Sequence, residues 1–79
     1  MGKYKALIEK LNSSIKHDRS QASLDLARCG TKASKAVPRL AELLYDENVG
    51  VQSSASYALR KIDTPEARRI MDAIDKSRR

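Results

Sequence analysis

The chain of 79 residues contains few of the residues on which most catalytic and cofactor sites depend. Its single histidine, His17, has no cysteine or carboxylate cluster near it at metal-ligand spacing. No serine stands in a Gly-x-Ser-x-Gly elbow, and the three glycines are isolated, so no phosphate-binding loop is indicated. We therefore predict that the protein is not an enzyme and has no catalytic residues, no metal and no cofactor.

Aromatic residues, cysteine and long apolar runs are also scarce. Tryptophan and phenylalanine are absent and there are three tyrosines, which argues against the base stacking that single-stranded nucleic acids require. Cys29 is the only cysteine, so we interpret it as a small apolar core residue. No run approaches the ~20 apolar residues of a membrane span. Residues 1–5 lack the apolar core of a signal peptide. We expect a cytoplasmic protein.

What the chain does contain is charge and helix-forming residues at regular spacing. One third of the residues are charged, which together with the length fits one small all-α domain. Two apolar stripes of helical period flank the polar segment Asp46–Asn48, whose residues favour a turn, with Asn48 as the helix cap. This pattern predicts a helical hairpin. The stripes consist of Val37, Leu40, Ala41 and Leu44, then Val51, Ala55, Ala58, Leu59 and Ile62.

The hairpin pattern occurs more than once. A shift of 33 residues aligns Leu7 with Leu40 and Leu26 with Leu59 without a gap. We predict a single domain over residues 1–79, with repeat one at about 3–30, repeat two at about 31–63 and a half repeat at 64–77. These repeats would supply five helices and one continuous core. The predicted core residues are Leu7, Leu11, Leu26, Leu40, Leu44, Leu59 and Ile62.

Local signals set the expected helix ends in repeat one. The first helix is predicted from about Lys3 to Ser14 or Ile15, with Ile15 on its inner face. A turn at His17–Asp18 would follow, and residues 18–21 resemble a capping box, with a start at Ser14 as the alternative. The second helix should then run to Arg28 or Cys29 and stop at Gly30.

The third helix is expected from Thr31 or Ser34, with a kink at Pro38. The fourth is predicted from about Val49 to Lys61. The fifth would begin after a Thr64 cap, with Pro65 at its first position, and reach about Asp75.

Ala36-Val37-Pro38-x-Leu40, followed by Asp46-Glu47-Asn48-x-x-Val51-Gln52-x-x-Ala55-x-x-Ala58-Leu59-x-x-Ile62, resembles a HEAT repeat. The pattern is most similar to the short HEAT-like repeats of phycobilisome lyases. Two positions depart from it, since Gln52 stands where arginine is usual and Asp18 where an apolar residue is expected. The resemblance implies an α-solenoid of about two and a half hairpins with right-handed superhelical stacking.

The formal net charge of +6 is concentrated at the predicted connections between hairpins. We call this region the basic edge, and it is a candidate site for a partner with an acidic surface, for nucleic acid or for anionic lipid. Ordinary solubilising charge is the alternative. The residues of the basic edge are Arg28, Lys32, Lys35, Arg39, Arg60, Lys61, Arg68 and Arg69.

The resemblance also implies that the second helix of each hairpin lines a concave face. The residues expected there are Arg19, Ser20 and Ser23 in repeat one, then Gln52, Ser53, Ser56 and Arg60 in repeat two. These side chains either form a flat groove for a partner helix or a phosphate backbone, or pack closely between neighbouring repeats. The sequence leaves both possibilities open.

We therefore expect a protein-binding scaffold that docks a partner on this concave face or on the basic edge. A module that binds duplex nucleic acid is the alternative, and a chromophore-lyase-related role, which rests on the repeat subtype alone, is more remote. The last predicted helix carries Ile70, Met71 and Ile74 with no helix after it. This stripe predicts either weak self-association or continuation of the solenoid.

Overall fold

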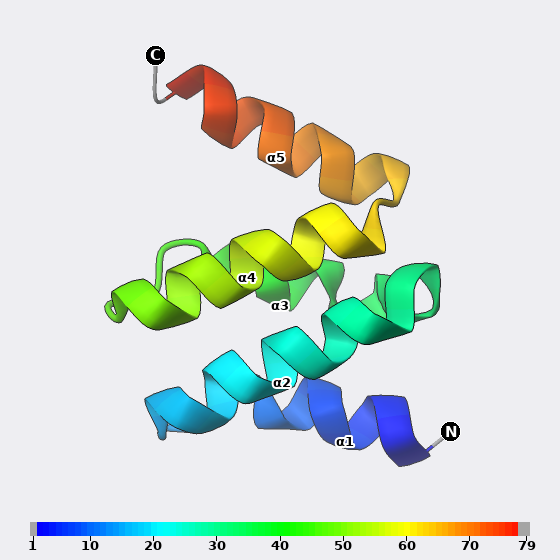
Figure 1. Ribbon diagram of the computed structural model, residues 1–79, viewed down its shortest axis with the longest axis vertical. Helices are drawn as coiled ribbons and strands as arrows, with labels where there is room; N and C mark the ends of the chain where they lie inside the picture. Colours follow the sequence, from blue (N-terminus) through cyan, green and yellow to red (C-terminus); the bar gives the residue numbers. More distant parts are fainter. Residues whose placement is uncertain (1, 78–79) are drawn as a thin grey trace.

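The computed structural model describes residues 2–77, which form helices joined by short turns and contain no strand. The prediction of an all-α fold is confirmed for this range. Helices α2 and α4 lie side by side, with α1 and α3 behind them and α5 beyond α4 (Figure 1). The elements are α1 (Gly2–Lys10), α2 (Lys16–Cys29), the 3₁₀ helix η1 (Gly30–Ala36), α3 (Val37–Leu43), α4 (Val49–Ile62) and α5 (Pro65–Ser77).

Helices α2 and α4 are equivalent in length and in position along the chain. The 33-residue shift maps Lys16 onto Val49 and Cys29 onto Ile62, so both ends of α2 coincide with both ends of α4. The two helices run in the same direction and share the most extensive helix–helix contact of the described residues (Figure 1). Helix α5 packs on α4 and also touches α3.

One core cluster joins these helices. Six of the predicted core residues are buried in it, whereas Leu7 is only partly buried and packs against its margin. Helix α1 packs mainly on α2, and Leu7 borders a surface hollow together with Tyr4 and Cys29. Small residues, among them Ala22, Ala55 and Ala58, are fully buried and allow close helix packing. The six confirmed core residues are Leu11, Leu26, Leu40, Leu44, Leu59 and Ile62.

The predicted boundary between the first two helices was wrong. Helix α1 ends at Lys10, Ile15 is 58% exposed, and His17 lies in the first turn of α2. The capping box does not form, because Asp18 accepts a hydrogen bond from Ser13 and Gln21 donates to Asp25. Ile15 is the N-cap residue of α2, but its side chain cannot cap the helix. The Ser13 hydroxyl accepts a hydrogen bond from the Ile15 amide, and the chain turns there, before the predicted turn at His17–Asp18.

The prediction for the third helix also needs correction. Residues 30–36 form the 3₁₀ helix η1, interrupted at Ala33, and the α-helix begins only at Val37. Pro38 therefore lies in the first turn of α3, where its missing N–H costs no helical hydrogen bond. The proline starts a helix here and does not kink one.

Other signals were read correctly. The Asn48 side chain caps α4 by accepting a hydrogen bond from the Val51 amide at 3.0 Å. At the start of α5, the Thr64 hydroxyl accepts a hydrogen bond from the Ala67 amide at 3.1 Å. Gly30 has a φ of 60° and ends α2, as predicted.

Asp63, with a φ of 51°, ends α4 in the left-handed conformation, which the sequence did not indicate. Helix α5 extends to Ser77, two residues beyond the predicted end.

Candidate binding surface

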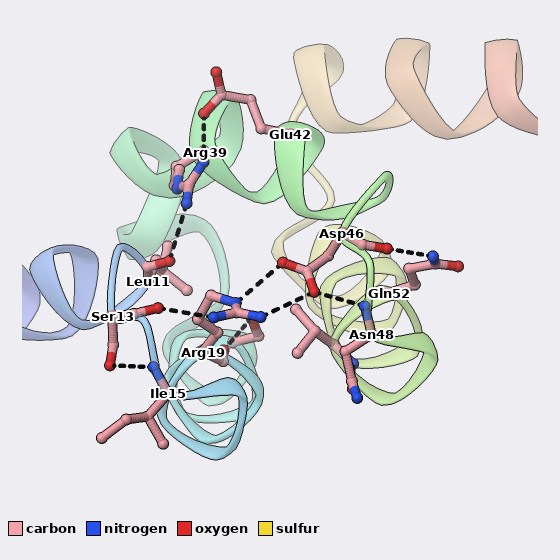
Figure 2. A network of polar contacts seen from close by, with 11 residues as sticks. Leu11, Ser13, Ile15, Arg19, Arg39, Glu42, Asp46, Asn48 and Gln52 are labelled. Carbon is pink, nitrogen blue, oxygen red and sulfur yellow. Dashed lines mark hydrogen bonds and ion pairs between the residues drawn. The ribbon is translucent and has the colours of Figure 1, made fainter.

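A buried ion pair joins the start of α2 to the turn before α4. Arg19 Nε lies 3.0 Å from Asp46 Oδ1, and Arg19 Nη2 donates to Asp46 Oδ2 at 3.1 Å (Figure 2). Each side chain is only 10% exposed. Arg19 Nη1 also donates to the Ser13 carbonyl at 2.9 Å, so a single guanidinium holds both within-hairpin turns.

The same network fixes the charge of Asp46. Its partial burial alone would raise the pKa, but the hydrogen bond from the Asn48 amide and the charge of Arg19 outweigh that effect. The net result is a pKa below the ordinary aspartate value. Asp46 is therefore ionised at neutral pH, and the Arg19 charge is matched inside the fold.

Gln52 is the counterpart of Arg19 in α4. Its amide nitrogen donates to the Asp46 carbonyl, just as Arg19 donates to the Ser13 carbonyl one repeat earlier (Figure 2). Glutamine reproduces this bond within the hairpin. It carries no charge that could bind an acidic turn of a further repeat.

Arg19 and Ser23 were predicted to contact a partner, and the structure contradicts this. Arg19 is 8% exposed and Ser23 is fully buried, where its hydroxyl donates to the Arg19 carbonyl at 2.8 Å. The hydroxyls of Ser20 and Ser54 lie 2.6 Å apart across the contact between α2 and α4. These small polar side chains pack between neighbouring helices, which was the second possibility left open by the sequence.

The equivalent residues of α4 remain accessible. Gln52 and Ser56 are half-buried and Arg60 is exposed, and together they line a groove of about 450 Å³ that we call the α4 groove. Val49 is 72% exposed and Tyr57 is 50% exposed, so the groove also presents apolar surface. The prediction missed these two residues, although their spacing with Ser53 marks one stripe of α4 opposite the core stripe. The remaining lining residues are Leu44, Val49, Ser53 and Tyr57.

The basic edge divides into two parts. At the end of α2 and along η1, Arg28, Lys32 and Lys35 are exposed, and Lys32 lines two adjoining hollows beside Tyr4 of α1. Arg39 is different, because its side chain is 33% exposed and pairs with Glu42 at 2.9 Å. Arg39 also donates to the Leu11 carbonyl at 3.4 Å (Figure 2), so it chiefly ties α3 to the end of α1.

The second part of the basic edge surrounds the junction of α4 and α5. Arg60 pairs with Asp75 at 3.3 Å, and Arg68 pairs with Asp63 at 2.9 Å. Lys61 lies over the Tyr57 ring at 5.5 Å from its centre. These exposed contacts contribute little to stability and leave the arginines free to exchange partners.

Among residues 2–77, no histidine, cysteine, aspartate and glutamate side chains gather in a group that could hold a metal ion. Over the same range, no helix combines the length and the apolar character needed to cross a membrane. Comparisons with protein-family models, curated proteins and solved structures found no match to the chain.

Proposed function

We propose that the protein is a non-catalytic protein-binding module, a short HEAT-like α-solenoid with right-handed stacking of its hairpins. The equivalence of α2 and α4 and their side-by-side packing support the repeat architecture. The function rests on one observation. The open α4 groove ends at Arg60, next to Lys61, and further exposed cations lie at the end of α2, along η1 and on α5. Such a surface favours a partner with acidic and apolar side chains.

The cations that support this proposal are those without a carboxylate partner. Arg28, Lys32, Lys35, Lys61 and Arg69 are exposed, and none forms an ion pair within residues 2–77. Duplex nucleic acid is the second candidate, because the same cations could neutralise phosphates. The exposed apolar side chains of Val49 and Tyr57 in the α4 groove favour a protein partner over a phosphate backbone.

Replacing four cations of the basic edge tests the proposal. We expect the variant Arg28→Gln, Lys32→Gln, Lys61→Gln and Arg68→Gln to lose at least tenfold in affinity for a glutamate-rich peptide at ~50 mM salt, with its helicity unchanged. Fluorescence anisotropy with labelled peptide and with a random 20-base-pair DNA duplex would measure both affinities.

A matched control removes the same charge elsewhere. Lys10, Lys16 and Lys76 are exposed outside the basic edge, and replacing these three by glutamine should weaken peptide binding less than replacing Arg28, Lys32 and Lys61 does. Tight binding of the duplex at ~150 mM salt with a steep salt dependence would favour the nucleic-acid candidate instead. Equal losses in both variants would mean that the basic edge only solubilises the protein.

A further inference from the structure

The α4 groove lies on the face of α4 that is equivalent to the face of α2 on which α4 packs. The 33-residue shift maps Arg19, Ser23 and Ala27 of α2 onto Gln52, Ser56 and Arg60 of α4. The first three are buried on α2, the helix on which α4 packs, and Arg19 is held by Asp46 in the turn before α4. Their counterparts line the open groove. Leu44, which also lines the groove, remains buried at 8% exposure, as its counterpart Leu11 does at 0%.

We propose that the α4 groove binds a helix of a partner protein, and that this helix lies on α4 as α4 lies on α2. It would run parallel to α4, the direction that α4 takes on α2 (Figure 1). This inference rests on the proposed protein-binding function and specifies the part of the surface that recognises the partner.

The contact between α2 and α4 indicates which residues the partner helix needs. Where α4 meets α2, it presents Ser54 opposite Ser20, and its neighbouring residues Ala55 and Ala58 are fully buried. Ser53 is the counterpart of Ser20, so a small residue opposite it allows the same close approach. The partner helix should therefore carry alanine or serine at successive turns of its docking face.

The two helices differ in charge at the C-terminal end of this face, and the difference indicates the charge that a partner helix should carry. The groove ends in Arg60, where α2 has the small apolar residue Ala27, and Lys61 is exposed next to it. Arg60 pairs with Asp75 through an exposed contact, whereas Lys61 forms no ion pair within residues 2–77. A glutamate or aspartate near the C-terminal end of the partner helix would therefore pair with Lys61. A second copy of this chain is disfavoured as the occupant, because each molecule carries a net charge of +6.

A designed peptide tests the proposal directly. The peptide copies residues 48–62, keeps the buried side chains of α4, and carries glutamate at positions 57, 60 and 61. A control peptide has lysine at those three positions. We expect the acidic peptide to bind the wild-type protein at ~150 mM salt and the lysine peptide to bind at least tenfold more weakly, as measured by fluorescence anisotropy.

Two protein variants separate docking in the groove from simple charge attraction. Ser56→Arg fills the groove but adds a positive charge, so groove docking predicts at least a tenfold loss of affinity for the acidic peptide. Charge attraction alone predicts equal or tighter binding, which would overturn the inference. Ser34→Arg adds the same charge at an exposed position of η1 and should leave binding unchanged or slightly tighter. Circular dichroism verifies folding, and Ser53→Arg provides a second blocking variant at an exposed position.

The outcomes also separate this inference from the proposed function. If the acidic peptide binds but Ser56→Arg and Ser53→Arg leave its affinity intact, the groove is not the site, while protein binding through the basic edge still stands. If wild-type protein self-associates in sedimentation and Ser56→Arg abolishes that association, a second copy occupies the groove and the inference is wrong. Absence of peptide binding up to ~1 mM would also overturn it.

Discussion

Helix α2 and helix α4 begin and end at equivalent positions, yet equivalent side chains on them lie in different surroundings. Ser23 is fully buried and makes a hydrogen bond inside the fold, whereas Ser56 lines an open groove. Arg19 is matched by Asp46, whereas Gln52 bonds only to its own turn. The residue types at these positions are similar, so the neighbouring helix decides which face is core and which is surface.

Helices α2 and α4 show that one pattern of residues can be buried or accessible, depending on what covers it. Small polar residues pack closely when a helix covers them, and they form an accessible groove when none does. Val49 and Arg60 of α4, which stand where α2 has Lys16 and Ala27, lie on the uncovered face.

The largest effect is expected at the core that both repeats share. Leu40 is fully buried in α3, and Leu40→Ala should reduce the free energy of unfolding by about 2–5 kcal/mol. A domain of this size has little stability in reserve, so much of the variant should be unfolded at 25 °C. Thermal unfolding followed by circular dichroism measures the loss. A variant as heat-resistant as the parent would contradict the core assignment.

A smaller effect is expected at the ion pair between the repeats. Arg19→Met leaves the buried carboxylate of Asp46 without its cation and should cost about 3 kcal/mol. The matched change Gln52→Met removes one hydrogen bond and should cost about 1 kcal/mol. Urea unfolding of the wild type and both variants measures the two losses of unfolding free energy.

The pH dependence provides a check on the same pair. Because folding lowers the pKa of Asp46, its contribution is complete above the unfolded aspartate pKa of about 3.9 and is lost as the pH falls through the folded value. The difference in unfolding free energy between the wild type and Arg19→Met should therefore become smaller as the pH falls. Equal costs for Arg19→Met and Gln52→Met would show that the pair does not join the repeats.

The smallest effects concern the helix caps. Asn48 and Ile15 are equivalent N-cap residues with similar extended backbones, at φ/ψ of −97°/124° and −88°/117°. Asn48→Ala should cost about 1 kcal/mol, whereas Ile15→Asn should stabilise α2 by about 0.5–1 kcal/mol, because it adds a missing cap at an exposed position. Melting temperatures of the two variants should move in opposite directions. A lower value for Ile15→Asn would mean that its apolar contacts matter more than the cap.

Much of the fold could be predicted from the sequence because apolar spacing and repetition are local signals. Leu26 and Leu59 define their helix faces without any knowledge of neighbours, and Asn48 and Thr64 cap the helices that follow them. The start of α2 could not be predicted in the same way. It depends on Ser13, whose carbonyl is held by Arg19 from the next helix.

The candidate site was less predictable, because burial there depends on a neighbouring helix. Arg19 and Ser23 match Gln52 and Ser56 in the repeat, and nothing in the residue types shows that only the second pair is accessible. Arg39 was grouped with the basic edge by charge, but its reach to the Leu11 carbonyl requires the folded chain. Exposed Arg28, Lys32 and Lys35 were correctly placed on the surface.

The central claim is that α2 and α4 present the same face, covered in one repeat and free in the other. Comparing the unfolding free energies of Ser23→Arg and Ser56→Arg tests it most directly. Ser23→Arg forces a large cation into a fully buried site and should cost at least about 3 kcal/mol. Ser56→Arg should change stability by less than about 1 kcal/mol. Similar losses in the two variants would contradict the account, because they would show that the face of α4 is already covered.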